Sequence, residues 1–229
     1  MPEKCFTSFL AKIAGAVLAL FFLAAAPAQT IDDARQLGFE IFKELVEINT
    51  VTATGDTGAA ADAMAARLRA AGFVEDDVKV FKPVARKGNL VARLRGNGSR
   101  KPILLLAHLD VVPAKREDWS CDPFKLIEKG GYFYGRGTSD DKFMAAAFIA
   151  NLIRYKQEGY KPDRDIIVTL ETDEEILDAN GIGITWLLAN HRDLIDAEIR
   201  VERGRASGAQ GRQARSERRS GQRKNLHQL

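Results

Sequence analysis

Residues 102–142, PILLLAHLDVVPAKREDWSCDPFKLIEKGGYFYGRGTSDDK, decide the fold of this 229-residue chain. They open with the apolar run 103–107, typical of a strand covered on both faces, which delivers His108 and Asp110 at its end. They close with a glycine-flanked turn that delivers Asp140 just before a helical pattern. Strand ends and strand-to-helix turns are where an α/β sheet exposes reactive side chains. The stretch therefore predicts a sheet with a functional site at its edge.

Two more carboxylates follow another apolar run, residues 166–170. Glu174 and Glu175 come shortly after this run, which has the β-branched composition of a buried strand. Imidazole nitrogen and carboxylate oxygen are ligands that suit zinc-like ions. We therefore predict a metal site, against the simpler alternatives in which His108 closes a strand and the acids start helices.

The remaining pattern alternates helices with strands. Thr30 and Asp33 predict a capping box, and apolar residues at helical spacing follow it as far as residue 48. The pattern predicts further helices near 59–71, 143–155 and 181–190, and strands at 78–81, 89–94, 103–107, 132–134 and 166–170. This alternation favours an α/β fold, a mixed, mostly parallel sheet sandwiched between helices.

The N-terminus predicts export. Lys4 and Lys12 precede an apolar run at 13–26, and small residues offer a cleavage site after Ala28. These features are typical of a signal peptide at residues 1–28, which implies a secreted or periplasmic protein without a membrane anchor after cleavage. The alternative is an uncleaved anchor. If the signal peptide is cleaved, Cys5 leaves with it and Cys121 is alone in the mature chain, so no internal disulfide is expected.

The composition changes after residue 198. Residues 199–229 contain eight Arg, one Lys and only two Glu, and they lack apolar periodicity. Such a segment buries too little surface to order itself, so we predict a disordered, Arg-rich tail. Residues 29–198 would form the folded part.

The ordered set HLDVVP, GRGTSDDK and TDEE resembles the M20 family of di-zinc metallopeptidases, which includes carboxypeptidases, aminoacylases and deacylases. WSCDPF and FYGRGTSDDK are most similar to the secreted carboxypeptidase branch. The resemblance runs from about residue 31 to 198. It implies the N-terminal part of a phosphorylase/hydrolase-like metallopeptidase catalytic domain, which would be incomplete.

The resemblance also implies a role for each site residue. His108 would bind the first metal, and Asp110 would orient it by accepting its other ring N–H. Asp140 would bridge two Zn2+ ions, a site that other divalent ions also suit. Glu175 would bind the second ion, and Glu174 would act as the general base.

The family pattern requires residues that this chain does not have as written. These are a carboxylate in an NEGG-like segment soon after Asp196, a later His, and a lid or dimerisation domain with another His. Degenerate codons exist for which skipping one base after codon 198 yields FALNEGGLA, which places Glu where Arg203 stands. We therefore expect a frameshifted, truncated and inactive chain, because each ion would lose a ligand.

The sequence thus predicts a zinc-dependent hydrolase of amide or peptide bonds, a metallo-carboxypeptidase or an N-acyl amino acid deacylase. Its substrate would be a small peptide or an N-acyl amino acid, and no nucleic acid is expected as a partner. The alternative is a non-catalytic exported binding protein whose basic tail holds polyanions.

Overall fold

The computed structural model describes residues 30–202 and 205–208, which form an α/β fold built on a six-stranded sheet. The strand order is β1-β2-β6-β3-β7-β8. These strands are β1 (Val78–Val84), β2 (Lys87–Leu94), β3 (Ile103–His108), β6 (Ile166–Glu171), β7 (Ile199–Glu202) and β8 (Arg205–Gly208). The predicted α/β sheet with helices is confirmed, and its central strands are the two apolar runs that lead to the candidate site.

The sheet is mixed, but it is not mostly parallel. β3 pairs in parallel with β6 and with β7, whereas β1–β2, β2–β6 and β7–β8 are antiparallel. The prediction of mostly parallel pairing is therefore wrong for the described strands. The physical reason is a tight turn at residues 85–86, where Arg86 has a φ of 62°, which makes β1 and β2 a hairpin.

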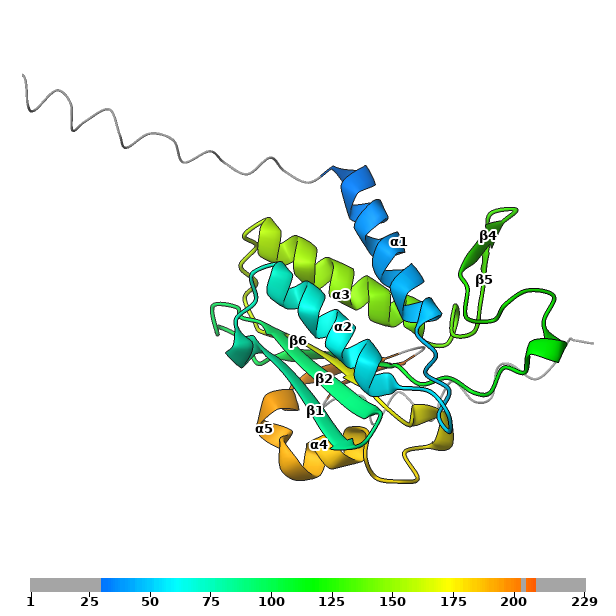
Figure 1. Ribbon diagram of the computed structural model, residues 1–229. Coiled ribbons are helices and arrows are strands. Elements are labelled where there is room, and N and C mark those ends of the chain that lie inside the picture. The colour runs from blue at the N-terminus through cyan, green and yellow to red at the C-terminus, as the bar shows by residue number, and fades with distance from the viewer. Residues whose placement is uncertain (1–29, 203–204, 209–229) are drawn as a thin grey trace, which may run out of the picture.

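Helices cover both faces of the sheet (Figure 1). One layer consists of α1 (Ile31–Glu47), α2 (Thr57–Ala70) and α3 (Lys142–Gln157). The short helices α4 (Ile184–Asn190) and α5 (Arg192–Ile195) lie on the opposite side. A separate hairpin of β4 (Ile127–Lys129) and β5 (Tyr132–Tyr134) projects near the end of α1.

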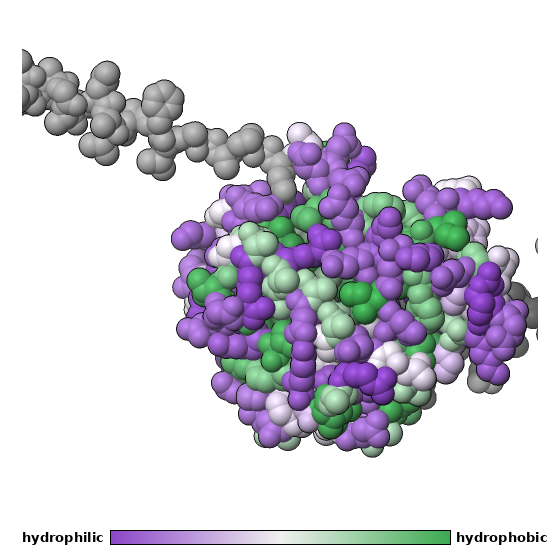
Figure 2. Space-filling model, in the orientation of Figure 1, coloured by the Kyte–Doolittle hydropathy of each residue, from purple (hydrophilic) through white to green (hydrophobic). Residues whose placement is uncertain are grey.

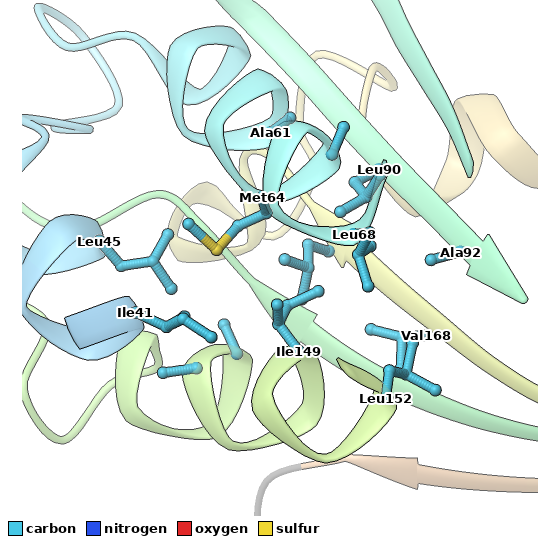
Figure 3. Packing of buried hydrophobic residues seen from close by; sticks show 14 of the residues in the cluster. Ile41, Leu45, Ala61, Met64, Leu68, Leu90, Ala92, Ile149, Leu152 and Val168 are labelled. Carbon is cyan, nitrogen blue, oxygen red and sulfur yellow. The ribbon is translucent and has the colours of Figure 1, made fainter. Parts of the chain in front are cut away.

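Successive side chains along the strands point to opposite faces of the sheet, so β2 and β6 pack against both helix layers. Leu90, Ala92 and Val168 point toward the three-helix layer, whereas Val91 and Ile167 pack under α4 and α5. Figure 3 shows side chains of α1, α2 and α3, among them Ile41, Leu45, Met64, Leu68, Ile149 and Leu152, meeting over the sheet. This larger cluster fixes α3, whose N-terminal end carries Asp140 into the site.

The local signals at the helix ends are mostly confirmed. Thr30 Oγ1 accepts from the Asp33 amide at 3.1 Å and the Asp33 carboxylate accepts from the Thr30 amide at 3.0 Å, so the capping box is present. α2 ends one residue earlier than predicted, at a C-cap formed by Ala71, and Gly72 follows with a φ of 90°.

The C-terminal part of the described chain differs from its prediction. Ile199–Glu202 forms strand β7 and Arg205–Gly208 forms strand β8, so the predicted disorder from residue 199 is wrong for these eight residues. Pairing of β7 with β3 and with β8 supplies the backbone hydrogen bonds that composition alone does not reveal. The rest of the predicted tail at 203–204 and 209–229, and the predicted signal peptide, lie outside the described residues.

The surface in Figure 2 is mostly polar, with scattered hydrophobic residues, as expected for a folded domain. Within residues 30–202 and 205–208, we find no helix with the length and apolar character needed to cross a bilayer.

Candidate metal centre

The candidate centre lies where β3 and β6 end side by side. These strands are parallel and in register, with His108 opposite Glu171, so their carboxyl ends meet at one edge of the sheet. The loop after β6 brings Glu174 and Glu175 to this edge on a short 3-10 turn, Glu174–Ile176. The start of α3 brings Asp140 to the same place. Sheet topology therefore assembles residues that are more than 60 positions apart in the sequence.

Three side chains that could together hold a metal ion converge at this edge. One ligand atom each from His108, Asp140 and Glu175 lies within 4.8 Å of the other two. His108 Nε2 is 2.9 Å from Asp140 Oδ1 and 3.5 Å from Glu174 Oε2. The structure thus brings together all the residues for which the sequence predicts a metal ligand, with Glu174 beside them.

The opposite ring nitrogen of His108 fixes the orientation of the imidazole. Nδ1 lies 3.0 Å from the backbone carbonyl oxygen of Asp110 and 3.6 Å from its carboxylate oxygen Oδ1. A carbonyl only accepts, so Nδ1 carries the proton and Nε2 is the nitrogen available to a ligand. The predicted partner residue is present, but its carbonyl oxygen lies closer to the ring than its carboxylate.

The Asp110 carboxylate has a different set of close contacts. It is fully buried, and it accepts hydrogen bonds from the Glu174 amide at 3.1 Å and the Glu175 amide at 3.0 Å. Thr52 Oγ1 donates to it at 3.2 Å. Burial opposes its ionisation, but His108 and the two amides outweigh burial and lower the pKa of Asp110. Asp110 therefore joins the His108 loop to the turn that carries the two glutamates.

The charges at the centre favour a bound cation. Burial raises the pKa of Glu175, and Asp140, Asp110 and Glu174 raise it further, whereas His108 lowers it. Burial opposes protonation of His108, yet the surrounding carboxylates raise its pKa from 6.5 to about 10. Clustered carboxylates beside one imidazole are a donor set that fits a divalent metal ion, which would replace the imidazole proton as the compensating charge.

Sequence reasoning missed two buried ionisable residues next to the centre. Lys142 is fully buried, and its Nζ donates to the Ile48 carbonyl at 2.8 Å. Burial lowers its pKa to about 7, against the attraction of Asp110. Glu171 accepts from the Ile184 amide at 2.7 Å, and burial raises its pKa to about 8. No local pattern distinguishes these side chains from exposed ones, because their burial depends on contacts distant in sequence.

Comparisons with known proteins identify the family and the fold of the chain. Residues 104–213 match the model of peptidase family M20/M25/M40. The N-fatty-acyl-amino acid synthase/hydrolase PM20D1 of Xenopus tropicalis is 45% identical over 110 residues, which cover 43% of this chain and 22% of that protein. The succinyl-diaminopimelate desuccinylase of Delftia acidovorans is 34% identical over 155 residues, which cover 67% of this chain and 40% of the enzyme.

A solved structure shows the same fold. The M20 family metallo-carboxypeptidase Sso-CP2 from Sulfolobus solfataricus superposes with a TM-score of 0.62 at 18% identity, over 73% of this chain and 37% of that chain. The chain spans less than half the length of each of these relatives. The ordered motifs, the family match and the shared fold agree, and the chain belongs to peptidase family M20.

Proposed function

We propose that this chain carries the metal-binding part of the catalytic domain of an exported, zinc-dependent hydrolase that cleaves N-acyl amino acids or small peptides. The observation that carries the proposal is the convergence of His108, Asp140 and Glu175 within 4.8 Å, with Glu174 at their edge. The names of the relatives, an N-fatty-acyl-amino acid synthase/hydrolase and a desuccinylase, support an N-acyl substrate. The alternative of a polyanion-binding protein gains no support from the family match.

Each residue has a distinct part in the proposed reaction. His108, Asp140 and Glu175 would hold the metal, which when bound supplies a Lewis acid for the scissile carbonyl and lowers the pKa of water. Glu174 is 45% exposed at its side chain, so it can receive a proton from water and pass it to the leaving nitrogen. Asp110 fixes both His108 and the amides of the turn, which keeps the base beside the ligands.

Replacing His108 with Ala is expected to weaken Co2+ or Zn2+ binding by more than about 100-fold, since even residues that only support a ligand contribute 10–100-fold. Zn2+ binding at pH 7 should also release about one proton, because the pKa of His108 lies near 10 without metal. Titration calorimetry in two buffers of different ionisation enthalpy measures both quantities.

The matched control for this experiment is His191→Ala. His191 stacks on Phe81 with ring centroids 4.1 Å apart and is not among the converging ligands. It should leave the affinity within about threefold of the parent protein, since it supports no ligand. Equal losses in both variants would contradict the proposed centre.

Export is the second part of the proposal, and the pattern at residues 1–28 supports it. We expect the exported protein to begin near Gln29. N-terminal sequencing of protein recovered from the periplasm or the medium measures this, and a sequence that starts at Met1 or Pro2 would refute cleavage.

We also propose that the reading frame shifts at codon 199. β7 runs parallel to β3, so it points to the edge of the sheet where His108 lies. In the shifted frame the strand would read FALN, which is more apolar than IRVE, and Glu would follow it. We call the protein read in this frame the restored chain.

A further inference from the structure

A buried ion pair lies behind the turn that carries Glu174 and Glu175. Lys87, the first residue of β2, places its Nζ 2.6 Å from Asp173 Oδ1. The Asp173 side chain is fully buried and that of Lys87 is 13% exposed. The same ammonium group donates to the Thr52 carbonyl at 2.5 Å. Neither Lys87 nor Asp173 is among the converging ligands, so the proposed reaction leaves this pair without a role.

Asp173 sits at a conformationally demanding position. Its φ is 65° and its ψ is 21°, a left-handed conformation that non-glycine residues seldom adopt, and it directly precedes Glu174. Its carboxylate accepts from Lys87, from Thr172 Oγ1 at 3.2 Å and from Asn180 Nδ2 at 3.0 Å. These contacts hold the backbone in the conformation that starts the turn.

The contacts of Lys87 lead to the Asp110 carboxylate by two routes. On one side, Lys87 binds Asp173, whose neighbour Glu174 donates its amide to Asp110. On the other side, Lys87 binds the carbonyl of Thr52, whose hydroxyl donates to the same Asp110 carboxylate. The turn with Glu174 and the loop after His108 are therefore connected directly, through the Glu174 amide, and also indirectly, through Lys87 and Thr52.

A second residue of β2 supports the same turn. Asn89 lies two positions after Lys87 and thus on the same face of the strand. Its side chain is buried, accepts from the Thr172 amide at 3.0 Å and donates to the Ile182 carbonyl at 2.8 Å. Lys87 and Asn89 therefore hold the loop between β6 and α4 against the rigid sheet.

We propose that Lys87 is a positioning residue that, by neutralising Asp173, fixes the turn presenting Glu174 and Glu175 to the metal centre. The inference rests on the proposed function for the meaning of that turn. Loss of the ammonium group would leave a buried, uncompensated carboxylate next to two further acids, an arrangement that favours opening of the turn toward water.

Amide hydrogen exchange and metal affinity in the 229-residue protein test the proposal. In Lys87→Met we expect the Glu174 and Glu175 amides to exchange at least about tenfold faster, because local opening exposes them. Co2+ affinity should fall by about 10–100-fold, the range for loss of a residue that supports ligands. Amides in the centres of β3 and α3 should keep their exchange rates.

Three variants separate the ion pair from a general loss of stability. Lys87→Met combined with Asp173→Asn removes both charges and should restore exchange to within about threefold of the parent, since no buried charge remains unpaired. Lys87→Arg keeps the positive charge, and its Glu174 and Glu175 amides should likewise exchange within about threefold of the parent rates. Lys79 lies on the neighbouring strand β1 and pairs with Asp76 in the turn before it; Lys79→Met removes this exposed ion pair and should leave the exchange rates and the Co2+ affinity unchanged.

The outcomes distinguish this inference from the proposed function. Unchanged Glu174 and Glu175 exchange in Lys87→Met, or faster exchange spread evenly over the protein, would overturn the positioning role. If Lys87→Met does not fold, the double variant decides, because it recovers native protection only if the unpaired charge was the cause. Absence of Co2+ binding in the parent protein would contradict the proposed metal centre alone, because amide exchange is measured without metal.

Discussion

Glu174→Gln in the restored chain is expected to remove nearly all hydrolysis while the metal stays bound. Glutamine has the same shape but cannot take a proton from water, so kcat should fall by about 10²–10⁴, the usual contribution of a general base. The side chain of Glu174 is not among the three converging side chains. The hydrogen bond from the Glu174 backbone N–H to the Asp110 carboxylate does not involve this side chain, so the substitution keeps it. Metal content and affinity should therefore match the parent.

Steady-state kinetics on N-succinyl and N-fatty-acyl amino acids, with metal analysis of the same samples, measures this effect. Glu175→Gln should instead lose metal together with activity, because it removes a predicted ligand. Glu117→Gln changes an exposed glutamate and serves as the matched control. A restored enzyme indifferent to Glu174→Gln would refute the assignment of the base.

Local sequence patterns predicted the elements that position the site. The apolar runs at 103–107 and 166–170 became β3 and β6, because continuous apolar strands need cover on both faces and so lie at the centre of a sheet. Their parallel pairing brings the residues that follow them to one edge. The resemblance to a known family implied the roles of the site residues, and the strand pattern predicted the sheet edge at which they meet.

Pairing partners and long-range contacts were beyond such patterns. The strands predicted at 78–81 and 89–94 are too short, since β1 continues to Val84 and β2 begins at Lys87. Extension of the hairpin by these residues places Lys87 against Asp173, 86 positions away. No periodicity encodes that contact, because it depends on which strand lies next to which.

For His108, too, the sequence predicted the position of the residue but not its contacts. Its place at a strand end followed from the sequence, but its hydrogen-bond partner depends on the course of the backbone after β3. The chain turns so that the Asp110 carbonyl faces Nδ1, which frees the Asp110 carboxylate for the amides of the glutamate turn. Residue types alone would not distinguish these two arrangements.

Restoring the frame should convert weak metal binding into catalysis. Removing one base in codon 199 is expected to yield a chain with Glu at position 203, directly after the strand that runs parallel to β3. A carboxylate there would join His108 and Asp140 and complete three protein ligands on the first ion, the number usual for catalytic zinc. Co2+ affinity should rise by at least about tenfold, and zinc-dependent hydrolysis of N-acyl amino acids should appear.

A single substitution separates the new ligand from the rest of the restored sequence. Arg203→Glu in the 229-residue chain should reproduce the gain in affinity without hydrolysis, because it adds the carboxylate but no further residues. Arg212→Glu makes the same charge change nine positions later and should leave the affinity near that of the parent, so it controls for the lower net charge of the tail. An early stop codon in the corrected frame would refute the frame proposal, and so would an Arg203→Glu protein that binds Co2+ no better than Arg212→Glu. The restored chain should then show both effects together, since affinity depends on the added ligand and turnover requires, in addition, the further residues that only the restored frame supplies.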